Sequence, residues 1–157
     1  MPMMDASQVL PAHLMPEIIV KVKTQYIQNQ SLPDEDKYVF AYHVDIYNPS
    51  HHTVQLLTRN WLITDGNGKM QEVQGDGVVG NTPILTPGES FQYSSGAVLN
   101  TQVGSMSGHY GMRVILTAED KAENEAENEA EGTAEQSGLM FKADIPVFTL
   151  AIPSALN

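Results

Sequence analysis

Hydrophobic and polar residues alternate along much of the chain, as they do in β-strands that bury one face. Segment 37–48 shows the pattern most clearly. Its apolar residues fall on one face: Phe40, Tyr42, Val44 and Ile46. Successive side chains of a strand point to opposite faces, so the pattern predicts a strand here with its other face toward solvent.

The same pattern predicts further strands at 17–27, 53–64, 69–74, 89–99, 104–117 and 139–151. Turn residues separate them: Asn48-Pro49-Ser50, a hairpin turn at 65–68, and a loop at 81–88. Gly108 and Gly111 indicate a bulge or bend, and Pro146 marks an edge position or a bulge. About seven short strands, with no amphipathic helical segment, are typical of an all-β antiparallel sandwich.

One domain is expected from 157 residues. Residues 1–16 lack any period and contain three prolines, so we expect a flexible arm before a domain at 17–153 and a short tail at 154–157. The arm does not resemble a signal peptide, and no run of about 20 apolar residues predicts membrane insertion. The chain has no cysteine, which is compatible with a reducing compartment, and the cytoplasm is the simplest location.

The net charge of −11 is unevenly distributed. Segment 118–138 holds eight acids and one lysine, a net of −7, which leaves −4 for the rest of the chain. We expect this low-complexity segment to be a solvated loop that at most collects divalent cations loosely. The remainder shows no stripe of lysine and arginine, so direct binding of nucleic acid is disfavoured.

The glycine-rich segment Gly75-Asp76-Gly77-Val78-Val79-Gly80 matches G-x-G-x-x-G. No helix is predicted after it, so a dinucleotide-binding unit is disfavoured. Two interpretations stay open: the glycines supply positive φ or a tight corner, or their N–H groups form a nest for phosphate or carboxylate. In the second interpretation Gly75, Asp76, Gly77 and Gly80 are the candidate anion-binding residues, although Asp76 would repel an anion.

A metal site can be drawn from His43 and Asp45, two residues apart on one strand face, with His51 and His52 in the next turn. Solvated histidines are the simpler interpretation, and His109 falls in a different strand with no carboxylate beside it. No cofactor is expected. Catalysis is disfavoured too, because the chain has no G-x-S-x-G elbow and Ser94-Ser95 needs no nucleophilic role.

Aromatic residues at strand positions are expected to pack in the core. They are Tyr42, Trp61, Phe91, Tyr93 and Tyr110. Near strand ends, Tyr38 and Tyr47 could instead line a groove for a partner.

Six ordered blocks resemble the bacterial ApaG family over about residues 17–153. They are YVFAYHVDIYN, VQLLTRNWLITDGNG, EVQGDGVVG, PGESFQYSSGAVL, GSMSGHYGM and DIPVFTLAIP. The resemblance implies an immunoglobulin-like or fibronectin type III-like sandwich and a role in protein interaction, since related domains occur in F-box adaptors and polymerase-interacting proteins. It also implies an indirect association with cobalt tolerance and magnesium efflux, and a proposed pyrophosphate site at Gly75, Gly77 and Gly80.

The chain departs from that family between Thr117 and Leu139, where a short turn is typical, and its N-terminal arm is longer than usual. The leading hypothesis is a non-catalytic module that binds a protein, either an unknown partner or a second copy of the chain, through an exposed edge or face. The alternative is a small-ligand module that binds phosphate, pyrophosphate or a nucleotide at the glycine segment.

Overall fold

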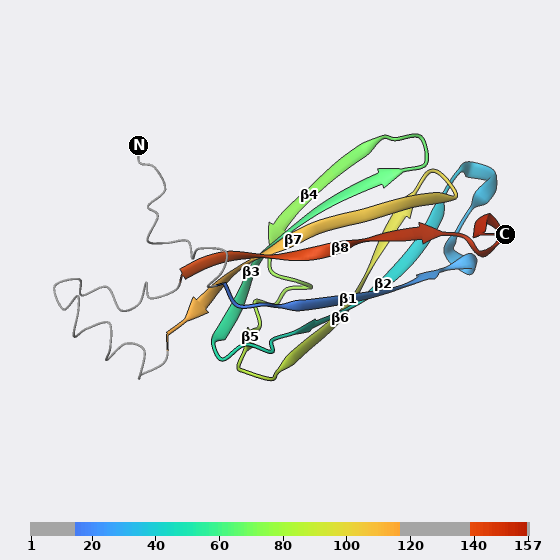
Figure 1. The fold of residues 1–157 in the computed structure, drawn as a ribbon. Helices are drawn as coiled ribbons and strands as arrows, with labels where there is room; N and C mark the ends of the chain where they lie inside the picture. The colour runs from blue at the N-terminus through green and yellow to red at the C-terminus, as the bar shows by residue number, and fades with distance from the viewer. Residues whose placement is uncertain (1–14, 117–138, 157) are drawn as a thin grey trace, which may run out of the picture.

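Two antiparallel sheets make up the computed structural model, which describes residues 15–116 and 139–156 (Figure 1). One sheet has the order β1 (Ile19–Tyr26), β2 (Tyr38–Tyr47), β6 (Ser90–Leu99). The other has the order β4 (Met70–Asp76), β3 (Thr53–Asp65), β7 (Val103–Ile115), β8 (Leu139–Ala151), with the short β5 (Ile84–Leu85) also paired to β3. Two short 3₁₀ helices, Gln28–Gln30 and Pro33–Glu35, lie between β1 and β2, and a third, Pro153–Leu156, follows β8.

The predicted antiparallel β-sandwich is confirmed. The alternation in β2 works as expected, because its even-numbered residues from Tyr38 to Ile46 are all buried. Four aromatic rings pack together between the sheets in tilted and edge-to-face contacts: Tyr42, Trp61, Tyr110 and Phe148. Tyr38 is also a core residue, so the hypothesis that it lines a partner groove is wrong for that residue.

Two bulges interrupt the five-stranded sheet on either side of β7. Opposite Gly111, β3 contains one extra residue, Leu57, and opposite Ser107, β8 places both Pro146 and Val147. The glycines of β7 permit these close approaches: a Cβ on Gly108 would collide with the carbonyl oxygen of Asn60. The predicted irregularity at Gly108 and Gly111 is therefore confirmed, although the extra residues belong to the neighbouring strands.

The bulge at Leu57 reverses the faces of β3. Before it, Val54 and Leu56 point into the core; after it, Arg59 and Trp61 point inward. Simple alternation from Leu56 would have turned Thr58 and Asn60 inward instead. An arginine is thus brought to the inner face of the sandwich.

Predicted strand ends agree closely with the structure, except in the loop 81–88. The hairpin at 65–68 forms as expected, with the Asp65 N–H donating to the Lys69 carbonyl at 2.9 Å. The loop, however, contains β5, whose Leu85 is buried. The expected tail at 154–157 begins as the 3₁₀ turn that starts at Pro153.

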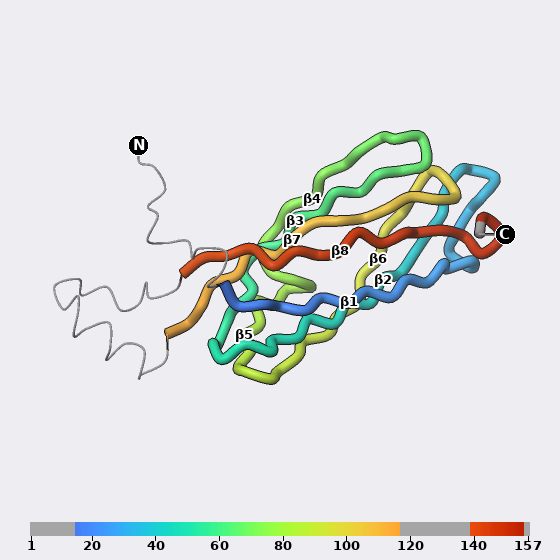
Figure 2. The backbone as a smooth tube through the Cα atoms, in the orientation of Figure 1, coloured from blue at the N-terminus to red at the C-terminus, as the bar shows by residue number. Residues whose placement is uncertain are grey.

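The sandwich is closed on one side and open on the other. β1 and β8 lie next to each other across the two sheets (Figure 2). Counted from this closed side, the strand orders are β1-β2-β6 and β8-β7-β3-β4. The edge strands on the opposite side are therefore β6 and β4. The three-stranded sheet therefore has no strand that covers β4.

Within the described ranges, no helix is long and apolar enough to cross a membrane. The predictions of a flexible arm at 1–16 and of a solvated loop at 118–138 concern mainly residues outside those ranges.

Candidate functional site

The glycine-rich segment finishes β4 and then forms a tight turn. Val78 and Asn81 exchange two backbone hydrogen bonds, at 2.8 and 2.9 Å, and the two residues between them have positive φ, 48° at Val79 and 80° at Gly80. These values define a type I′ turn. The side chain of Val78 is fully buried, which anchors the turn to the core.

Gly77 connects this turn to the bulge of β3. Its φ is 67°, and its N–H donates to the Leu57 carbonyl at 2.8 Å. The N–H of Val78 is also engaged, by Asn81. The interpretation in which the glycines supply positive φ is confirmed at Gly77 and Gly80. An anion nest that used the N–H groups of Gly77 and Val78 would have to break these bonds.

Gly77→Ala is expected to lower the free energy of unfolding by about 2–3 kcal/mol, because the added Cβ combines positive φ with a collision at the Asn81 carbonyl. Gly80→Ala has positive φ and open space, and should cost only about 1 kcal/mol. Urea denaturation of both variants measures the difference. Equal losses would mean that Gly77 is needed for its φ alone.

Arg59 is the cation nearest to this segment. Its guanidinium lies flat over Gly75, where an added Cβ would come within 2.7–2.8 Å of its carbon and both terminal nitrogens. Nη1 donates to the carbonyls of Asp76 and Gly77, each at 2.9 Å. Sequence reasoning missed this residue because the bulge at Leu57 decides which way it points. The prediction of an anion site at residues 75–80 is untested, and Arg59 is the group that favours it.

His43 and Asp45 share the outer face of the three-stranded sheet, as predicted. His43 Nδ1 forms a 2.6 Å hydrogen bond with Ser94 Oγ of β6, and Asp45 lies in register with Lys21 of β1. Asp45 Oδ1 is buried without a hydrogen-bond partner. Among the described residues no three histidine, aspartate or glutamate side chains gather as metal ligands would, and the metal hypothesis remains a prediction.

The contact between His43 and Ser94 has the chemistry of a base beside a nucleophile, which sequence reasoning did not foresee. Both side chains are exposed on the face of a sheet. Hydrolytic sites use such a pair inside a pocket that also supplies oxyanion donors and excludes water. The exposed pair is therefore better explained as a cross-strand contact.

His109 has a carboxylate neighbour that the sequence did not reveal. It lies in register with Asp144 of β8 on the outer face of the five-stranded sheet. The prediction that no carboxylate lies beside His109 is wrong, because strand pairing brings together residues 35 positions apart.

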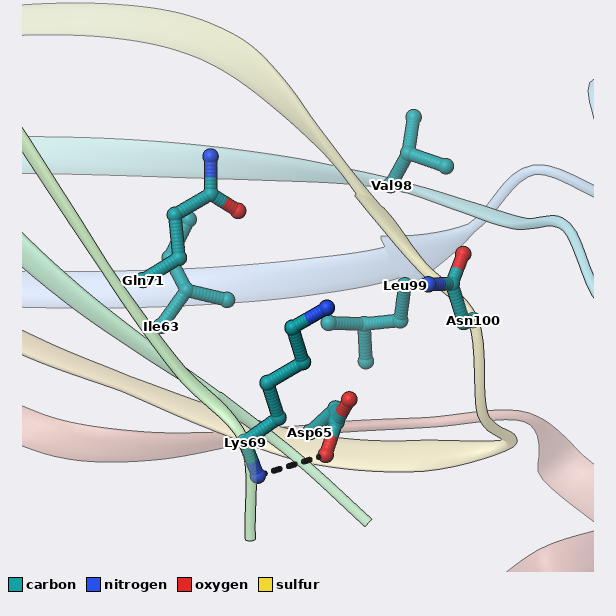
Figure 3. Close-up of a pocket in the computed structure, with 7 residues that line it drawn as sticks. All are labelled: Ile63, Asp65, Lys69, Gln71, Val98, Leu99 and Asn100. Atoms are coloured by element: carbon teal, nitrogen blue, oxygen red, sulfur yellow. Dashed lines mark hydrogen bonds between the residues drawn. The ribbon is translucent and has the colours of Figure 1, made fainter. Parts of the chain in front are cut away.

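A shallow pocket lies near the end of the open side, between β4 and the end of β6 (Figure 3). Its volume is about 90 Å³, well below the roughly 300 Å³ at which pockets for small organic ligands begin. The lining mixes apolar and polar side chains: Ile63, Asp65, Lys69, Gln71, Val98, Leu99 and Asn100. The hollow separates the start of β4 from the end of β6 on the open side of the sandwich.

Further along this side, two tyrosines join the sheets. The hydroxyls of Tyr93 in β6 and Tyr110 in β7 form a 2.5 Å hydrogen bond. Burial raises the pKa of Tyr93 to about 12, and burial also raises the pKa of Tyr110. Both are therefore neutral hydrogen-bonding groups at physiological pH rather than acids or bases.

Comparison with known proteins decides the family. The model of the ApaG domain matches residues 28–114, which is more than half of the chain. The chain belongs to the ApaG family. Protein ApaG of Pectobacterium carotovorum is 45% identical over 142 residues, covering 90% of this chain and 97% of that protein. Protein ApaG of Escherichia coli O1:K1 is 44% identical over the same shares.

A crystal structure of an ApaA protein from Bordetella pertussis is similar in three dimensions. It has a TM-score of 0.72 and 39% sequence identity, and the match covers 88% of this chain and 95% of that one. The predicted family is confirmed by the family model and by these relatives, and the structural match extends over most of the chain.

Proposed function

We propose that this ApaG chain is a cytoplasmic, non-catalytic module that binds another protein by adding a strand of the partner to the free edge of β6. A strand at a sheet edge presents unpaired N–H and C=O groups, which pair readily with an extended segment of another chain. The observation that carries the proposal is the difference between β6 and the other free edges.

Soluble proteins protect free edges with charges, prolines and bulges. β1 carries Lys21 and Lys23, β4 carries Glu72 and Asp76, and β8 carries a bulge at Pro146. β6 has none of these devices. Its ten residues, SFQYSSGAVL, contain no charge and no proline, and they pair with β2 without a register shift. Six of the ten are exposed. An unprotected edge of this length favours a role in binding.

Ser95→Lys is expected to reduce partner binding by about tenfold or more, because an inward-pointing charge would have to be buried by the added strand. Ser95 lies on the same face of β6 as the inward-facing Tyr93 and Ala97. Because Ser95 is exposed, a lysine fits there in the unbound protein. The measurement is affinity capture from the parent cells, quantified by mass spectrometry, together with sedimentation analysis for pairing with a second copy.

Thr24→Lys provides the matched control, since Thr24 is exposed, shares the parity of the inward-facing Val20 and Val22 of β1, and is in register with Tyr42 as Ser95 is. This variant should recover the same partners as the unmodified protein. Equal recovery by the Ser95→Lys variant would show that the partner does not use the β6 edge.

A further inference from the structure

The open side of the sandwich lacks one strand. The five-stranded sheet extends to β4, whereas the three-stranded sheet ends at β6, so the inner face of β4 has no strand opposite it. A segment added to β6 would occupy this position. Strand addition at β6 would therefore complete a second layer as well as extend a sheet.

Apolar side chains along this gap are only half-buried. They point inward from three strands: Ile63 of β3, Val73 of β4, and Phe91 and Tyr93 of β6. Gln71 of β4, which lines the pocket in Figure 3, is exposed. An added strand with apolar residues on its inward face would remove these partly exposed side chains from water, which is the main favourable term in such binding.

Arg59 projects into the same gap. It lies in register with Tyr110 on one side and with Gly75 on the other, both on inward-facing positions. Its charge is close enough to Tyr93 of β6 to oppose the rise in the pKa of that phenol. The cation is therefore positioned between β4 and β6, where an added strand would lie.

Only part of the guanidinium is satisfied. The two N–H groups of Nη1 donate to the carbonyls of Asp76 and Gly77. Within the described part of the chain, no carboxylate pairs with Arg59, and neither Nε nor Nη2 has a hydrogen-bond acceptor. A half-buried cation held only by carbonyl dipoles is stabilised by an anionic oxygen ligand. Carboxylates fit best, because they accept two parallel N–H bonds from a guanidinium.

We infer that the strand bound at β6 carries an aspartate or glutamate on its inward face, and that Arg59 selects it. The ligand is thus an extended segment with alternating apolar residues and one acidic residue that reaches the guanidinium. This inference rests on the proposed strand addition at β6. The proposed function says where the partner binds, and this inference says which side chains the bound segment carries.

The test begins with a displayed library of random twelve-residue segments, selected against the unmodified protein. The best acidic peptide and the same peptide with its carboxylate changed to the amide are then titrated by calorimetry. We expect the acidic form to bind about tenfold more tightly, as a charge-assisted pair allows. Arg59→Gln should abolish this preference, and Arg113→Gln should keep it, because Arg113 contacts Gln55 on the outer face of the five-stranded sheet.

Arg59→Lys covers the case in which Arg59→Gln does not fold. It keeps the charge but loses the planar fork, so the preference for the acidic peptide should fall severalfold. A preference as strong as that of the unmodified protein would overturn the role of the guanidinium, and so would an acidic peptide with no advantage over its amide.

Two further outcomes separate the inference from the proposal on which it rests. If no segment binds, or if Ser95→Lys leaves peptide binding unchanged, strand addition at β6 fails as a whole. Inorganic pyrophosphate is titrated in parallel. Pyrophosphate binding that requires Arg59, together with no preference among the peptides, would overturn the strand ligand in favour of a small anion at the glycine segment.

Discussion

Replacing Gly108 with alanine is expected to destabilise the domain by more than about 3 kcal/mol, enough to lower the melting temperature by roughly 10 °C. The added Cβ would collide with the backbone oxygen of Asn60 and approach the Cα of Trp61 at 3.1 Å. Neither is the end of a flexible side chain, so β3 and β7 must separate where the aromatic cluster packs. Thermal unfolding followed by circular dichroism measures the loss.

Gly68→Ala is the control for the effect of replacing a glycine where the added Cβ meets no neighbouring atom. Gly68 has positive φ but open space around it, so its replacement should cost only about 1 kcal/mol. If the Gly108→Ala and Gly68→Ala variants have the same melting temperature, β3 and β7 tolerate separation. The close approach in the structure would then have no energetic importance.

Asn48→Ala is expected to cost about 3 kcal/mol or more, because four hydrogen bonds to a fully buried amide are lost together. Nδ2 donates to the carbonyls of His52 and Leu85 at 2.7 and 3.0 Å, and Oδ1 accepts from the N–H and hydroxyl of Ser50. The backbone of Asn48 also binds Gly88 and Glu89. This residue ties the end of β2 to β5 and to the start of β6, and chemical denaturation gives its contribution.

Asn48→Asp gives a test with a defined pH dependence. The carboxylate would face two carbonyl oxygens, which raises its pKa in the folded state above the unfolded value of about 3.9. The stability of this variant relative to the unmodified protein should therefore be highest below the unfolded pKa and fall as pH rises through the folded one. Ser50→Ala removes the hydroxyl that donates to Asn48 Oδ1, together with two exposed contacts of that hydroxyl to the backbone of His52, and should cost about 1 kcal/mol. If Asn48→Ala lowers the free energy of unfolding no more than Ser50→Ala does, the four hydrogen bonds of the Asn48 side chain do not contribute together to stability.

Much of the fold follows from local patterns. The two-residue period placed the side chains of β2 on their correct faces and gave the bounds of β8, and turn chemistry predicted the hairpin at 65–68. These features depend on neighbours in the sequence. Gly108 and Gly111 were predicted to mark irregularity for the same reason, since glycine in a strand signals a bulge or a close approach.

The candidate site depends on distant residues and could not be predicted in the same way. A single extra residue, Leu57, turns Arg59 inward, and nothing in the local period announces it. The unprotected edge of β6 has meaning only once the sheet order is known. His109 and Asp144 are neighbours solely through strand pairing. The residues 75–80 were found from their spacing, but the cation beside them was not.

The contact between β1 and β8 has a consequence for synthesis of the protein. The strand that closes the sandwich against β1 is residues 139–151, so the closed side forms only after that segment has left the ribosome. At roughly 5–20 residues per second, about ten seconds separate the appearance of β2 from that of β8. For about the second half of this interval the uncharged β6 is already present without its opposing layer complete. The nascent chain is therefore most vulnerable to wrong pairing before β8 arrives, and a chaperone that covers β6 during this interval should raise the yield of folded protein.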